Sequence, residues 1–331
     1  RLLNQYIDML MLIEKKEFRS AHLTGLKSKL YSHEKSASRI ISSLKNILHV
    51  LDYRHTLLVG FVLDSLLIWD IRCVYRLHKW HKAYEAQLGQ WFEVIAQMDT
   101  LISLANLNYN HPDWCLPSIS DKGSVIQADH LGHPLIAREK RVDNHFSLAN
   151  AEQVVIITGA NMAGKSTFLR TLGVNLILAS QGCKVCASAF TFSPVRLFTH
   201  MRTSDNLMKD ESFFYAELLR LHHMLELLRK GENLFIIIDE MLKGTNSIDK
   251  LNGSIELLKQ LIQLRTHCVV ATHDLKLTEL ADHYPGLIKN QCFEVNLTGE
   301  ELTFDYQLRV GVTSTMNATF LMRKMGIIPH Q

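Results

Sequence analysis

Proline is absent from the first 111 residues of the chain, and glycine occurs there only three times. Because proline breaks helix interiors and glycine weakens them, this scarcity leaves room for long helices. Apolar residues recur at helical spacing in the same region, as at Leu2, Ile7, Leu10 and Ile13. We therefore predict an all-α helical domain over residues 1–115, which ends in the polar stretch around Pro112 and Pro117.

Paired cysteines and long apolar runs are also missing. The six cysteines are scattered, and Cys183-Lys-Val-Cys186 has no second pair, so we expect buried thiols in a reducing compartment rather than a zinc site. The most apolar stretch, Leu57 to Ile71, is too short for the roughly 20 residues of a membrane span, and it contains two aspartates. We predict a buried helix there, no membrane contact through this segment and a cytoplasmic location. The chain begins at Arg1 rather than at methionine, so we interpret it as part of a longer protein, which leaves room for an upstream membrane anchor.

Charge is nearly balanced, with 36 Lys and Arg against 33 Asp and Glu, a net charge of +3. A balance this mild does not by itself indicate nucleic acid. The first 50 residues, however, carry a clear excess of positive charge. This segment suits DNA phosphates or anionic lipid equally well, and a merely solvated helix face explains it no less well.

From about residue 124 the pattern changes to short apolar runs separated by helical stretches. The runs Val154–Ile157, Leu234–Ile238 and Cys268–Ala271 each read as a buried strand that ends in polar residues. Continuous apolar strands that alternate with helices are typical of a parallel α/β sheet covered on both faces. Such sheets bind ligands at the carboxyl ends of their strands.

The segment Gly159-Ala-Asn-Met-Ala-Gly-Lys-Ser166 fits the P-loop pattern G-x-x-x-x-G-K-[ST]. It follows a predicted strand and precedes a helical run, which is the context that a P-loop requires. Its backbone N–H groups and the helix N-terminus would cradle phosphates, Lys165 would reach the β- and γ-phosphates, and Ser166 would ligate Mg²⁺. The cofactors predicted are therefore ATP and Mg²⁺.

A carboxylate pair ends the second predicted strand, and its first member lies 74 residues after Lys165. Asp239 fits the Mg²⁺ carboxylate of a Walker B strand, and Glu240 fits the residue that activates the attacking water. His273 ends the third strand, where its position beside these motifs favours a γ-phosphate sensor over a structural histidine. We predict Lys165, Glu240 and His273 as catalytic residues.

These motifs resemble the ATPase domain of the MutS DNA mismatch-repair family. The resemblance is carried by Gly159-Ala-Asn-Met-Ala-Gly-Lys-Ser-Thr167, with Asn-Met inside the P-loop, and by Gly244-Thr-Asn-Ser247 and Ala271-Thr-His-Asp274. Leu131-Gly-His-Pro134, Asp210 to Glu217 and Met98 to Ala105 also resemble family segments, so the likeness runs from about residue 90 to the C-terminus. It implies a P-loop ATPase domain of ABC-like class over residues 116–331, preceded by part of a helical core or lever.

The resemblance also implies a homodimer of ATPase domains in which each completes the other's site. Ser212 would contact the partner's γ-phosphate in trans, Asp249 would lie in the loop that faces the other site, and Phe304 to Gly326 would support the dimer. Adenine would lie near Val142. The nucleotide contacts expected within the loop are Gly159, Asn161, Met162, Gly164, Lys165, Ser166 and Thr167.

The chain departs from the family pattern in several places. Ala163 replaces a P-loop glycine, and Lys243 replaces the usual arginine after the carboxylate pair, which changes the hydrogen-bond geometry available there. Roughly 120 helical residues leave no room for a clamp or a mismatch-reading domain. We therefore expect DNA contacts, if any, to be made with phosphates.

Three functions remain open. The first is a MutS-like ATPase in a DNA transaction. The second is a related nucleotide switch with another role, near DNA or a membrane; the presence of Glu240 argues against a switch that does not hydrolyse ATP. The third, an ABC- or SMC-type ATPase, requires a Ser-Gly-Gly motif that the interval between the Walker motifs lacks.

Overall fold

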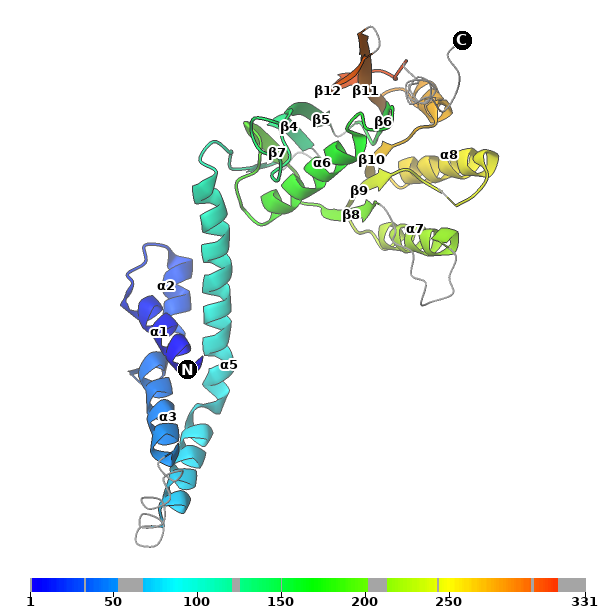
Figure 1. Cartoon of the computed structure of the whole chain (residues 1–331). Coiled ribbons are helices and arrows are strands. Elements are labelled where there is room, and N and C mark those ends of the chain that lie inside the picture. Colours follow the sequence, from blue (N-terminus) through cyan, green and yellow to red (C-terminus); the bar gives the residue numbers. More distant parts are fainter. Residues whose placement is uncertain are drawn as a thin grey trace. The chain divides into compact units, whose positions relative to one another are not determined.

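The computed structural model describes residues 2–32, 34–52, 68–120, 126–149, 151–201, 213–242, 244–298 and 301–314. The chain divides into two compact units, Arg1–Asn106 and Leu107–Gln331. The division lies nine residues before the boundary expected from the prolines. One helix, α5 (Trp69–Asn110), runs through it (Figure 1).

The first unit is built from helices, with one pair of two-residue strands among its described residues. Its elements are α1 (Leu2–Lys15), α2 (Ala21–Ser28), β1 (Tyr31–Ser32), β2 (Lys35–Ser36), α3 (Ala37–Asp52) and most of α5. Their apolar faces form one core, which includes Leu10, Leu30 and Trp91. The Trp80 indole N–H within this core donates to Ile40 O at 3.0 Å, so a polar group that is buried there has its partner.

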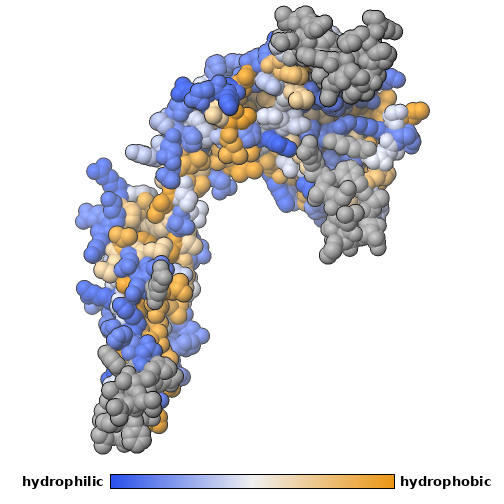
Figure 2. All heavy atoms as spheres, viewed as in Figure 1, coloured by the Kyte–Doolittle hydropathy of each residue, from blue (hydrophilic) through white to orange (hydrophobic). Residues whose placement is uncertain are grey.

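Most of the predicted apolar helix from Leu57 to Ile71 lies outside the described residues. Ile71 itself belongs to α5 and is 68% exposed. Among the described helices none is both long and apolar enough to cross a membrane. Figure 2 shows polar and apolar side chains interspersed on the visible face of the described residues.

The second unit contains a mostly parallel sheet of six strands in the order β12-β11-β6-β10-β9-β8. Five neighbouring strands run parallel, and β12 closes one edge as the antiparallel partner of β11. The strands are β6 (Val154–Gly159), β8 (Arg196–His200), β9 (Leu234–Asp239), β10 (His267–Ala271), β11 (Ile288–Thr298) and β12 (Glu301–Val310). The expectation of an α/β fold with a parallel sheet is confirmed.

Both faces of this sheet are covered, which explains why its central strands are continuous apolar runs. Val155 and Ile157 face one core, and Val154 and Ile156 face the other, as the two-residue repeat of a strand requires. On the first face lie α6 (Lys165–Ser180) and a four-stranded sheet; on the second lie α7 (Phe213–Arg229) and α8 (Ser247–Gln263) (Figure 1).

The four-stranded sheet has the order β3-β7-β4-β5 and is largely antiparallel. Its strands are β3 (Ser118–Ile119), β4 (Ile126–Leu131), β5 (Asn144–Leu148) and β7 (Ala189–Phe192). The remaining short elements are η2 (Leu275–Glu279) and α9 (Leu280–His283). The six cysteines all lie in described residues; each is a free thiol, and all but the half-buried Cys115 are buried.

Candidate nucleotide site

The predicted P-loop connects β6 to α6, and its backbone requires glycine at two points. Gly159 has φ +153°, and a Cβ there would meet the backbone oxygen of Phe293 in the adjacent strand β11 at 2.8 Å. Gly164 has φ +110° and lies directly before α6, where a Cβ would contact the Tyr306 ring at 3.2 Å. Met162 is also in the left-handed region, at φ +66°. The loop therefore wraps tightly around the N-terminus of α6, as an anion-binding turn does.

Lys165 is the first residue of α6, and its side chain folds back over the loop. Its ammonium group donates to Gly159 O at 2.6 Å and to Ala160 O at 2.9 Å. Burial lowers the pKa of Lys165 to about 8, against the opposing effect of the Asp239 and Glu240 carboxylates. The lysine is therefore a buried cation that the surrounding protein stabilises only in part, as expected of a group that meets an anionic ligand.

The carboxylates lie at the carboxyl end of β9, beside the end of β10. Asp239 is paired in register with Ala271, and the backbone N–H of Glu240 donates to Ala271 O at 2.9 Å. Glu240 then turns sharply, with φ +66°, as the chain leaves the sheet. The strand order β6-β10-β9 places the P-loop and the carboxylates at the same edge of the sheet, on either side of β10.

One cavity of about 180 Å³ joins these groups. Seven of the predicted site residues line it, together with Ala271: Asn161, Met162, Lys165, Ser166, Asp239, Glu240 and His273. These residues come from three strand ends that are up to 112 positions apart in the sequence. The structure thus brings the predicted cation, the predicted Mg²⁺ ligands and the predicted water-activating group to one place.

His273 follows β10 and faces the same charges. Desolvation, and then the positive charge of Lys165, lowers the pKa of His273 below its ordinary 6.5. At neutral pH the imidazole is therefore uncharged, with one N–H available as a hydrogen-bond donor.

A second cavity, of about 350 Å³, adjoins the first and shares Met162 and Ser166 with it. Val142, Gly164 and Thr167 also line it, so these three predicted contacts belong to this second cavity. The remaining wall includes the rings of Phe293 and Tyr306.

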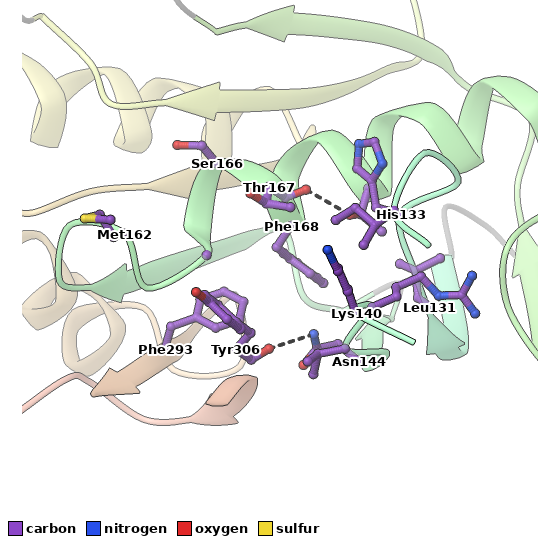
Figure 3. A pocket seen from close by; sticks show the side chains of 15 residues that line it. Leu131, His133, Lys140, Asn144, Met162, Ser166, Thr167, Phe168, Phe293 and Tyr306 are labelled. Carbon is purple, nitrogen blue, oxygen red and sulfur yellow. Dashed lines mark hydrogen bonds between the residues drawn. The ribbon is translucent and has the colours of Figure 1, made fainter. Parts of the chain in front are cut away.

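The side chain of Asn144 connects two strands of that wall. Its amide donates to Tyr306 O at 3.0 Å and accepts from the Leu308 N–H at 2.6 Å, which joins β5 to β12 (Figure 3). No local pattern indicates this contact, because 162 residues separate Asn144 from Tyr306. Phe304 to Val310, expected to support a dimer, lie in the edge strand β12; the rest of that C-terminal segment lies beyond the described residues, apart from Gly311 to Ser314.

Asp249, one of the two residues expected to act across a dimer, lines neither cavity. Asp249 is exposed in the first turn of α8, where its N–H donates to the side chain of Asn246, the N-cap residue, at 2.9 Å. Ser212, like the segment before it and Lys243, lies outside the described residues.

Two contacts of the turn after β9 were not predicted from the sequence. Lys250 of α8 is ion-paired with Glu240, with 2.5 Å between Nζ and Oε1. Glu217 of α7, only 1% exposed, binds His200 at 3.0 Å and accepts from the Leu242 N–H at 2.7 Å. A lysine near the start of a helix and a glutamate within an apolar helix were the available signals, but neither reveals its partner.

The family model for MutS domain V matches residues 155–330, more than half of the chain. The chain belongs to the MutS family. The DNA mismatch repair protein MSH4 of Arabidopsis thaliana is 30% identical over 243 residues, which cover 72% of this chain and 30% of that protein. The DNA mismatch repair protein MutS of Thermotoga sp. (strain RQ2) is 31% identical over 254 residues, 74% of this chain and 31% of that protein.

A third relative, the MutS protein homolog 4 of Homo sapiens, is 26% identical over 302 residues, which cover 89% of this chain and 30% of that protein. The MutS-type chain described here thus spans about a third of the length of these relatives. The matched region contains the P-loop, the carboxylate pair and His273.

Proposed function

We propose that this chain binds ATP together with Mg²⁺ and hydrolyses it to ADP and phosphate, as part of a DNA transaction related to mismatch repair. The observation that carries the proposal is the convergence of Lys165, Ser166, Asp239, Glu240 and His273 on one cavity. The names of the relatives support the DNA setting.

The residues of the cavity suit Mg²⁺. Ser166 and Asp239 offer a hydroxyl and a carboxylate, which are the hard oxygen ligands that Mg²⁺ prefers. A site with few protein ligands is appropriate, because Mg²⁺ keeps several waters and takes other ligands from phosphates. When bound, the ion would neutralise charge that develops on the phosphates.

The chain's own groups then have separate tasks. Lys165 would exchange its two loop carbonyls for phosphate oxygens, while the N–H groups at the start of α6 hold the same phosphates. Glu240 would accept a proton from the attacking water, and the uncharged His273 would donate an N–H to the γ-phosphate. The adenine of ATP would enter the larger cavity, beside Val142 and the aromatic rings of Phe293 and Tyr306.

We infer the wider setting from the family. The helical residues 1–115 would serve as a lever, and residues 116–331 as the ATPase domain, whose C-terminal part supports a homodimer. Contact with DNA would be made through phosphates. A cytoplasmic location accords with this function.

A phosphate-release assay on the 331-residue chain tests the proposal. Lys165→Ala should abolish Mg²⁺-dependent turnover and nucleotide binding, since the cation that offsets the phosphate charge is gone. Glu240→Ala should bind nucleotide normally and lose turnover, since only the proton acceptor is missing. Lys276→Ala, which removes an exposed lysine away from the cavity, is the matched control and should behave as wild type.

The test also separates turnover from a pure nucleotide switch. A switch would bind ATP with Mg²⁺ through Lys165 and release no phosphate, and Glu240→Ala would then change nothing. Normal turnover in Glu240→Ala would instead refute the assigned role of that carboxylate.

A further inference from the structure

Lys250 lines neither of the two cavities, yet it forms an ion pair with Glu240, the proposed base. Its ammonium lies 2.5 Å from Glu240 Oε1, and both side chains are 24% exposed. Lys250 does not line the smaller cavity, whereas Glu240 does. The lysine therefore approaches the carboxylate from the side of α8, behind the surface that would meet the nucleotide.

The position of Lys250 in α8 is electrostatically unfavourable for a lysine. Asn246 caps this helix, and the Lys250 N–H donates to Asn246 O at 2.9 Å within the first turn. The positive end of the helix dipole favours anions there and opposes cations. Asp249 meets that preference, while Lys250 opposes it, so the contact with Glu240 must supply the compensation.

Other contacts already fix the backbone of Glu240, so Lys250 acts on the position of its side chain. The Glu240 N–H is held by Ala271 O, and φ is +66°. The side chain faces the like charge of Asp239, the imidazole of His273 and two cations, Lys165 and Lys250. Lys165 donates to loop carbonyls, and in the proposed function it turns to phosphate. The ammonium of Lys250, by contrast, is directed at the Glu240 carboxylate.

We propose that Lys250 is a positioning residue for Glu240, holding the carboxylate in place so that it can accept the proton of the attacking water. This inference rests on the proposed function and adds a residue to it. The charge of Lys250 also reaches His273, where it is one of the effects that lower the pKa of the imidazole. Because Lys250 lies in the first turn of α8, the position of the Glu240 carboxylate depends on the position of that turn.

The experiment compares kcat and KM for ATP turnover in wild type, Lys250→Met, Lys250→Arg and Lys259→Met. Methionine keeps most of the side-chain length without the charge, and arginine keeps the charge. Lys259 is the matched control, because it forms an ion pair with Glu256 on the same helix, remote from the cavity. Thermal unfolding of each variant establishes that it is folded.

Lys250→Met should lower kcat about tenfold at neutral pH, a part of what general-base catalysis contributes, with KM changed less than about twofold. Arginine should restore most of kcat, and Lys259→Met should match wild type.

The result that overturns the inference is an unaltered kcat in Lys250→Met while wild type turns over ATP. A faster Lys250→Met variant also overturns it, since the lysine would then restrain Glu240 instead of assisting it. Wild-type protein that binds ATP but shows no turnover at any pH would refute the proposed function itself, and this inference with it. The two failures are therefore distinguishable.

Discussion

The Glu217 carboxylate accepts a hydrogen bond of 2.7 Å from the backbone N–H of Leu242, two residues beyond Glu240. The same oxygen, Oε1, lies 3.0 Å from His200 Nε2 at the end of β8. Leu242 has φ +54°, so the turn needs an external partner to remain in this form. Glu217 thus ties β8, α7 and the turn after β9 together at one atom.

Replacing this carboxylate should destabilise the protein. Glu217→Ala leaves a buried histidine and a buried N–H without their acceptor, which should lower the free energy of unfolding by about 3 kcal/mol. Urea denaturation measures the loss. The control, Glu226→Ala on the same helix, removes an exposed contact to His222 and should cost less than about 0.5 kcal/mol. Equal effects of the two substitutions would show that the buried contact contributes little.

Nucleotide affinity should fall as the pH rises through the pKa of Lys165. In the free site this pKa is about 8, lowered chiefly by burial. Bound phosphate favours the charged ammonium, so binding above this pH requires proton uptake. The affinity should then weaken about tenfold for each further pH unit, following the linkage between protonation and binding.

Titration of a fluorescent ATP analogue with Mg²⁺, from about pH 6.5 to about pH 9.5, measures this slope across the lysine transition. Lys165→Arg supplies the comparison: its guanidinium stays charged, so binding should lose this pH dependence whatever its absolute strength. A slope that persists in the arginine variant would assign it to another group.

If two chains form composite sites, inactive variants should complement each other. Lys165→Ala lacks the P-loop cation and Ser212→Ala lacks the proposed trans contact, so a heterodimer of the two retains one intact site. A randomly exchanged equal mixture should recover about a quarter of wild-type turnover. Subunit exchange is followed separately by energy transfer between labelled chains; exchange without recovered activity would exclude action in trans.

DNA binding should depend on salt and not on mismatches. Lys15, Lys16 and Arg19 are exposed at the end of α1 and just after it, where they can contact phosphates, and phosphate contacts carry no sequence information. Neutralising all three should weaken binding and reduce its salt dependence. Binding to matched and G·T-mismatched duplexes across a salt series measures both; a tenfold mismatch preference, about 1.4 kcal/mol, would contradict the expectation.

The core of the site could be predicted because each part carries a local pattern. β6, β9 and β10 are buried on both faces, so their sequences are unbroken apolar runs, and the polar residues that follow must share an edge of a parallel sheet. The P-loop adds glycines that the observed φ angles require at Gly159 and Gly164. The adenine contact expected at Val142 comes from the resemblance alone and stays a prediction.

The parts that could not be predicted depend on contacts between distant segments. β11 contains Lys289, Asn290 and Gln291 in sequence, which hides its place beside β6. The strands of the second sheet are two to six residues long, too short for a period to emerge. Helical periodicity likewise does not predict which carboxylate Lys250 contacts, because the turn between β9 and α8 reverses the chain.

The Asn144 amide matches the N–H and C=O of β12 as a neighbouring strand would, although it belongs to a different sheet. Unfolding of either sheet from this edge must therefore break the same two bonds. The wall of the larger cavity, with Tyr306, is thereby coupled to β5, so the two sheets should lose their structure together in a single cooperative step.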